Sequence, residues 1–133
     1  MNKLNRIAMS GAAAAALVAP VLAGPAHAGF DATITAHATD SHVRSGEQFR
    51  VHGKYLLGDG TPVTNRMVRV QSKNANGSWT TIRGAHLRTN SEGRYRIRVI
   101  LFRKGERKLR VRAQGPDANT SPIRSRPFTV RVR

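Results

Sequence analysis

The chain has 133 residues, with 23 Lys and Arg against seven Asp and Glu, a formal net charge of +16, and no cysteine. The length fits one domain. The absence of cysteine excludes disulfide staples and a lipid attachment site, so a folded domain must depend on packing alone. So large a positive charge predicts a polyanionic partner without identifying it.

Residues 1–28 have the pattern of a Sec-type secretory signal peptide. Two basic residues precede an apolar, alanine-rich run at 7–22, and small residues lead up to a cleavage position after Ala28. The run is too short and too poor in large apolar residues to predict an uncleaved membrane anchor. We therefore expect a secreted, extracellular domain of residues 29–133, in which 21 basic residues stand against the seven acids.

Beyond residue 29 apolar residues alternate with polar ones, and no helical period occurs. Short alternating runs are separated by turn residues every ~8–12 positions, which is typical of an all-β sandwich or barrel. Apolar side chains at every second position predict one buried and one exposed face for each strand. The seven expected strands are 30–37, 47–55, 66–73, 78–83, 94–101, 106–113 and 126–133.

The segment from Asn74 to Gly77 predicts a hairpin turn, and its Asn-Gly pair favours type I′ geometry, in which both central residues have positive φ. Trp79 and Ile82 follow on the returning strand, an odd number of positions apart. Burying both requires a β-bulge or a strong twist. We expect Trp79 to serve core or hairpin packing, with a ligand platform as the alternative.

Three turn motifs occur in order along residues 45–133. They are Gly-x-Pro-Val from Gly60, Gly-x-Trp-x-x-Ile from Gly77, and Asn-x-x-Gly-x-Tyr from Asn90. In these motifs the chain resembles the bacterial Ig-like domains of exported actinobacterial proteins. The resemblance implies an Ig-like antiparallel β-sandwich of about seven strands. Its motifs are turn and core residues, so it implies little about activity.

The alternation also decides where the cations lie. In an Ig-like sandwich the strands 94–101 and 106–113 belong to opposite sheets, and Arg50, His52 and Lys54 share the outer face of the first. Both broad faces are then basic. If the two strands pair as a hairpin instead, their cations form one dense patch, and the sequence leaves both arrangements open. The residues expected to bind a polyanion are Arg69, Arg94, Arg96, Arg98, Lys108, Arg110, Arg112, Arg131 and Arg133.

No motif in the chain predicts catalysis. Ser, His and Asp all occur, but no nucleophile elbow holds them, and the seven acids are scattered. His37, Asp40 and His42 are close enough in sequence to share a metal, but no third His or Cys follows at a recognised spacing. Asp59 lies in a Gly-Asp-Gly loop, which is weak evidence for calcium in so basic a domain. We expect no enzyme activity, no metal and no cofactor.

These observations predict a secreted, non-enzymatic binding module that associates electrostatically with anionic envelope or extracellular polymers. Teichoic acid, acidic glycan and extracellular DNA all have the required charge. Sequence-specific DNA binding is not expected, because the chain offers no helix for a major groove and few aromatic residues to stack bases. The alternative is a structural or protein-interaction adhesion module whose charge is incidental. A small hydrolase is a third hypothesis, and no motif favours it.

Overall fold

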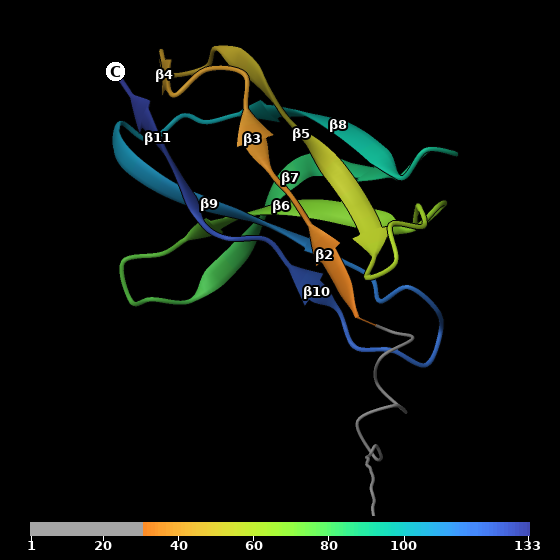
Figure 1. The fold of residues 1–133 in the computed structure, drawn as a ribbon. Coiled ribbons are helices and arrows are strands. Elements are labelled where there is room, and N and C mark those ends of the chain that lie inside the picture. Colours follow the sequence, from red (N-terminus) through yellow and green to blue (C-terminus); the bar gives the residue numbers. More distant parts are fainter. Residues whose placement is uncertain (1–30) are drawn as a thin grey trace, which may run out of the picture. The chain divides into compact units, whose positions relative to one another are not determined.

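The computed structural model describes residues 31–133, and they form two β-sheets packed face to face (Figure 1). The small sheet contains β2 (Ala32–Ile34), β3 (His37–Ala38), β5 (Gln48–Leu57) and β8 (Arg94–Ile100). The large sheet contains β4 (His42–Val43), β6 (Met67–Lys73), β7 (Trp79–Arg88), β9 (Gly105–Ala113), β10 (Ile123–Arg124) and β11 (Phe128–Val132). The predicted signal peptide lies outside the described residues. Within 31–133 no helix is long and apolar enough to cross a membrane.

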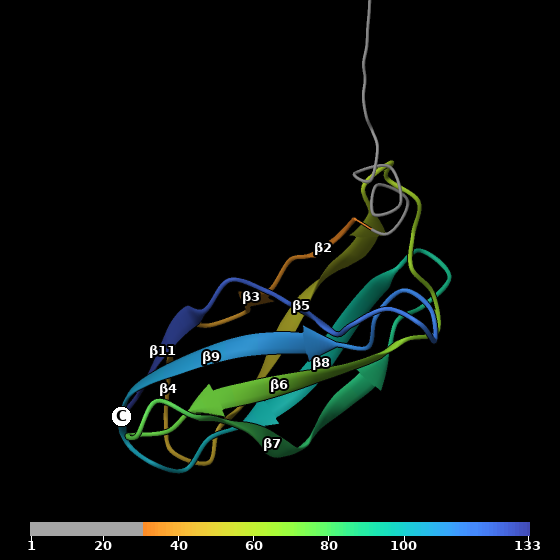
Figure 2. The same cartoon turned by 90° about the horizontal axis from the view of Figure 1, so that it is seen from below.

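The strand order is that of an antiparallel sandwich. In the small sheet β5 lies between β8 on one side and β2 and β3 on the other. In the large sheet the order is β4-β11-β9-β6-β7, with β10 added along β9. Figure 2 shows β9 and β6 side by side in front of β5 and β8. The two-residue pair of β11 with β4 is parallel, and the other described strand pairs are antiparallel.

All seven expected strands occur, and the Ig-like sandwich prediction is confirmed. The first is interrupted into β2 and β3, and the short strands β4 and β10 are additional. The prediction for 78–83 was too short, because β7 continues to Arg88. The register of β7 against β6 shifts between the partners of Arg69 and Gln71, so the chain forms a bulge that contains Gly84, with φ 75°. Gly84, which directly follows the expected strand 78–83, therefore lies inside β7 at an irregularity.

The hairpin at Asn74 is present, but the predicted type I′ geometry is wrong. The Gly77 amide donates to the Asn74 carbonyl, and the Asn74 amide donates to the Ser78 carbonyl. Of these loop residues only Gly77 has a positive φ, at 89°. The loop therefore has three residues, a turn followed by a left-handed glycine, and this geometry needs only one positive φ.

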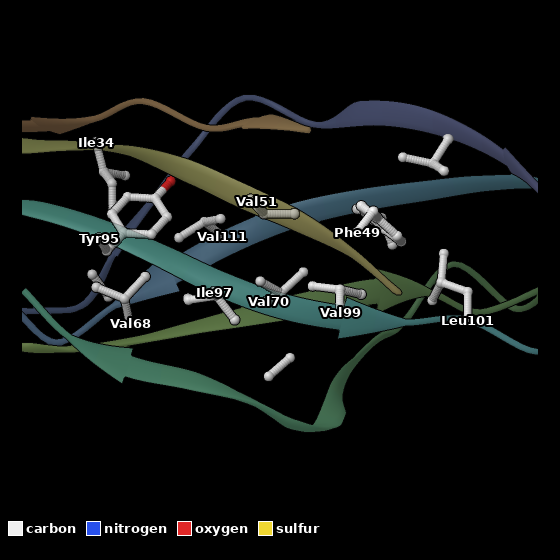
Figure 3. Packing of buried hydrophobic residues seen from close by; sticks show 14 of the residues in the cluster. Ile34, Phe49, Val51, Val68, Val70, Tyr95, Ile97, Val99, Leu101 and Val111 are labelled. Atoms are coloured by element: carbon white, nitrogen blue, oxygen red, sulfur yellow. The ribbon is translucent and has the colours of Figure 1, made fainter. Parts of the chain in front are cut away.

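The inner faces of both sheets supply the core (Figure 3). Figure 3 shows Val51 and Ile97 of the small sheet packed toward Val70 and Val111 of the large sheet, and all four are buried. The other buried apolar side chains are Ile34, Val43, Phe49, Tyr55, Val63, Val68, Ala85, Tyr95, Val99, Leu101, Leu109, Ala113, Val130 and Val132. Burial of this apolar area between the sheets is the main source of stability in a domain without cysteine.

Two buried tyrosines donate hydrogen bonds from the core to backbone carbonyls at its edge. The Tyr55 hydroxyl donates to the Gln114 carbonyl at 2.6 Å, and the Tyr95 hydroxyl donates to the Thr35 carbonyl. Tyr95 stands opposite Gly53 on β5, where a Cβ would collide with the Thr35 carbonyl and lie 2.7 Å from the tyrosine hydroxyl. Gly53 is required because the tyrosine and the edge strand approach its backbone so closely.

A Gly53→Ala variant tests this close approach. The new methyl meets backbone that cannot move without displacing β2, so we expect a loss of about 3 kcal/mol in the free energy of unfolding, or no folding. Gly60→Ala is the matched control, because Gly60 has positive φ and open space around it. The control is expected to lose only about 1 kcal/mol. Urea unfolding measures both, and equal losses would contradict the assignment.

The tyrosines also predict a pH dependence. Burial raises the pKa of Tyr55 from 10.0 to about 12, and burial raises that of Tyr95 as well. Folding therefore favours the neutral phenols. Their contribution to stability is complete below pH 10 and is lost as the pH rises from 10 toward 12. These are the two tyrosines of the chain, so tyrosinate absorbance should appear near pH 10 in urea-unfolded protein and well above it in folded protein. Coincident curves would contradict the prediction.

Candidate polyanion-binding surface

The outer face of the small sheet is a ladder of cations. Outward residues of β5 stand directly opposite outward residues of β8, because cross-strand partners share a face of the sheet. The like-charged pairs are Arg50 with Arg98 and Lys54 with Arg94, and between them His52 stands opposite Arg96. None of the outward positions on β5 and β8 carries an acid.

A histidine from the edge strand extends the middle row of this ladder. His37 of β3 pairs with His52 of β5, and their ring centroids are 5.9 Å apart. The row therefore runs His37, His52, Arg96 across three strands. Protonated imidazoles here would add positive charge to a face that is already cationic.

A hollow of ≈ 820 Å³ lies over this part of the face. Four of its lining residues are the cations Lys54, Arg88, Arg94 and Arg96, and no lining residue is acidic. The remaining lining residues are Thr35, His37, His52, Gly53, Leu87, Asn90 and Tyr95. Glu92 lies 3.9 Å from Arg94 (Oε1 to Nε), but both side chains are exposed and such a pair is weak. The hollow can therefore accept an anion without displacing a strong internal ion pair.

The outer face of the large sheet is also basic, but its central arginine already has partners. The Arg110 Nε donates to Gln71 Oε1 at 2.8 Å, and its guanidinium carbon lies 4.3 Å from the Trp79 ring centroid. Burial lowers the pKa of Arg110, and the charges of Arg124 and Arg112 lower it further. This arginine is held by an amide and an aromatic ring, an arrangement that stabilises the sheet itself.

Trp79 does not belong to the core. It is half-buried on the outer face beneath Arg110, whereas Ile82 packs against the core from the inner side. The odd spacing of the two residues thus places them on opposite faces, and burying both was never required. The tryptophan packs beside the hairpin, as the packing hypothesis expected, but the part of that hypothesis that placed it in the core is wrong.

The structure separates the nine predicted binding residues into two groups. Strand β8 pairs with β5, and β9 pairs with β6, β10 and β11, so the single-patch arrangement does not occur. Arg94, Arg96 and Arg98 lie on the small sheet. The remaining six lie on the large sheet or at its end: Arg69, Lys108, Arg110, Arg112, Arg131 and Arg133. The large sheet also has an acid on this face. Glu106 stands opposite Arg131 on the neighbouring strand, and the two side chains approach to 3.9 Å.

The prediction of site residues left out several members of the hollow. Lys54 and His52 were placed on the correct face by alternation but were not included as binding residues. His37 falls at an outward position of the expected strand 30–37, because the apolar residues Ala32, Ile34 and Ala36 alternate along it. Arg88 had no such signal, because the expected strand ended five residues earlier, at Arg83.

His37, Asp40 and His42 are close in sequence, but their pattern does not predict a metal site. Among residues 31–133 no three His, Cys, Asp or Glu side chains are grouped so that they could hold a metal ion. Asp59 instead caps its own loop, because its Oδ1 accepts the Thr61 amide at 2.9 Å. Hydrogen bonds from Thr61 lower the pKa of this carboxyl.

The chain matches no protein-family model and no curated protein. Among solved structures it is similar to a conjugative transposon lipoprotein from Bacteroides eggerthii, at 11% identity and TM-score 0.49, over 76% of this chain and 97% of that one. It is also similar to the CARDB domain of a Pyrococcus furiosus protein in complex with di-metal ions, at 18% identity and TM-score 0.45, over 77% and 92% of the chains.

A third similar structure is an alkylpurine DNA glycosylase from Pseudomonas fluorescens bound to DNA with an abasic site analogue. The identity is 12%, the TM-score 0.45, and the match covers 77% of this chain but 30% of that one. At such identities the comparison concerns the fold alone. The resemblance to exported actinobacterial Ig-like domains therefore stays a prediction.

The cation ladder predicts a stabilising substitution. Arg98→Glu replaces the like-charged pair with Arg50 by an opposite pair, so we expect the free energy of unfolding to rise by about 0.5–1 kcal/mol at low salt. The gain should shrink in high salt, which screens exposed charges. Urea unfolding is suitable because urea adds no ions. Arg126→Glu changes the net charge equally but lies between strands, and an equal gain there would show that net charge alone matters.

Proposed function

We propose that this protein is a secreted, non-enzymatic binding module whose basic surface associates electrostatically with anionic polymers. The single observation that supports this proposal is the acid-free cation ladder on the small sheet, with the hollow above it. Three cross-strand rows of basic side chains face one another there without carboxylates between them. Each like-charged pair costs about 0.2–1 kcal/mol in the isolated protein, and a bound polyanion relieves that cost.

The chemistry of the face favours phosphate, sulfate or carboxylate groups spaced along a polymer. Arginine presents a planar fork of donors that binds such groups bidentately. Side chains two apart on one strand are about 6.6–6.8 Å apart, and neighbouring strands are about 4.8 Å apart. The ladder is thus a broad grid of cations, which suits a repeating anion better than one compact ligand. Teichoic acid, acidic glycan and extracellular DNA all meet this requirement.

The proposal identifies the small sheet as the principal binding face. The central arginine of the large sheet is engaged with Gln71 and Trp79, and Glu106 offsets Arg131. On the small sheet no ion pair of Arg96 occurs among residues 31–133, and the weak contact with Glu92 involves Arg94. Equal numbers of cations on the two faces should therefore contribute unequally to binding.

Heparin chromatography tests the function and the face together. The intact protein should elute above about 0.2 M salt, and elution below that concentration would contradict a dedicated polyanion binder. The triple variant Arg94→Gln, Arg96→Gln, Arg98→Gln should elute at clearly lower salt. The matched variant Lys108→Gln, Arg112→Gln, Arg131→Gln removes the same charge from the large sheet and should shift elution less. Equal shifts would contradict the assignment to the small sheet.

A further inference from the structure

Two exposed apolar side chains follow the cation ladder along β8. The outward residues of this strand are Arg94, Arg96, Arg98 and Ile100, and Phe102 follows two positions later in the loop. Ile100 is 38% exposed and Phe102 is 71% exposed. Single exposed apolar residues are common on protein surfaces. Phe102 differs from such residues because it is more exposed and has a second apolar side chain beside it. The way its loop is held also matters.

The loop that carries Phe102 is held by hydrogen bonds to the β4–β5 turn. The Ser45 hydroxyl donates to the Phe102 carbonyl at 2.6 Å, and the Gly46 amide donates to the Leu101 carbonyl at 2.8 Å. The Phe102 ring lies over Gly46, with Cε1 3.6 Å from the position that a Cβ there would occupy. The phenylalanine is thus presented by a fixed backbone, so a partner that buries it need not first order the loop.

Cations surround this end of the sandwich. Figure 1 shows the β4–β5 turn, the β8–β9 loop and the end of β11 together at one end, and the Ser45 amide donates to the Arg133 carbonyl. Arg103 and Lys104 follow Phe102 directly, and Arg44 precedes Ser45. Burial, and then the charge of Arg103, lower the pKa of Arg107, so these two arginines are close.

Two acids at this end, Glu47 and Glu106, are engaged within the protein. Glu47 Oε1 accepts the Arg44 amide at 2.8 Å and so closes its own turn. Glu106 lies 3.9 Å from Arg131. Arg103 and Lys104, beside the exposed phenylalanine, therefore have no carboxylate within 4 Å among the described residues. The tip combines an apolar anchor with basic side chains.

We propose that this tip docks on the surface of a bilayer that contains anionic lipid. Phe102 and Ile100 enter the boundary between headgroups and acyl chains, while Arg103, Lys104 and Arg44 contact the anionic headgroups. Stable attachment to a membrane needs two signals, here an apolar anchor and a basic patch, and each basic residue near the surface contributes about a fivefold increase in binding. An anionic polymer offers no apolar layer for Phe102. A second copy of this chain is disfavoured, because each copy has a formal charge of +16.

This inference goes beyond the proposed function, because it concerns the end of the sandwich and a different class of partner. Phe102→Ser changes no charge, so elution from heparin should stay the same. Binding to vesicles of equal phosphatidylcholine and phosphatidylglycerol, measured by co-sedimentation, should fall about tenfold or more. Unchanged vesicle binding would overturn the proposal. Self-association that the substitution abolishes, without loss of vesicle binding, would assign the tip to a second copy.

A charge variant separates the tip from net charge. Arg103→Gln with Lys104→Gln should weaken binding to the mixed vesicles more than Arg124→Gln with Arg126→Gln. The second pair removes the same charge away from the tip, where Arg124 pairs with Arg112 in the second half of β9. Equal losses would show that charge acts without regard to position, and the tip would then have no special role.

A fluorescent probe reports insertion directly. The chain has one tryptophan, so Trp79→Phe with Phe102→Trp places the only indole at the tip. Its emission should shift to the blue with the mixed vesicles, and should not shift with phosphatidylcholine vesicles or heparin. An unshifted spectrum with the mixed vesicles would overturn the proposal. Trp79→Phe alone, with a cooperative thermal unfolding transition, establishes that the variant background is folded.

Discussion

The alternation of apolar and polar residues along each strand is the constraint on which the structure depends. With no cysteine, the domain is stabilised mainly by burial between its two sheets, so every long strand must give one face to the core. Val51, Ile97, Val70 and Val111 meet this requirement from four strands. The same period leaves every second position free of packing, and most of the cations occupy such positions. Core and charged surface are thus specified by one pattern.

This pattern explains why so much of the fold could be predicted. All seven expected strands occur, because local alternation marks each of them. Of the two arrangements that the sequence left open for 94–101 and 106–113, the structure has the Ig-like one, with the strands in opposite sheets. What failed depends on contacts across strands. The bulge at Gly84 exists only against β6, and the number of residues in the Asn74 loop depends on which pair closes it. Neither is encoded in periodicity.

The candidate site was predictable to the same extent and for the same reason. Alternation placed Arg94, Arg96 and Arg98 on one outer face, and the structure agrees. It could not show that Arg110 would be engaged by Gln71 and Trp79, since these contacts join distant parts of the sequence. Both faces place like charges opposite one another, since Arg112 stands between Arg69 and Arg124 on the large sheet. The faces differ because the large sheet engages its central cation with Gln71 and Trp79 and has an acid, Glu106, beside Arg131.

If the proposed function is correct, the cation ladder makes folding and binding compete. Arg50 and Arg98 repel each other in the free protein, and an anion that bridges them removes a cost that the fold otherwise carries. Substitutions that optimise the isolated domain should therefore act against its partner, which is the usual relation between stability and activity at functional sites. Without a bound anion, neighbouring cations on this surface repel one another. The concentration and type of anions around the domain should therefore change its free energy of unfolding.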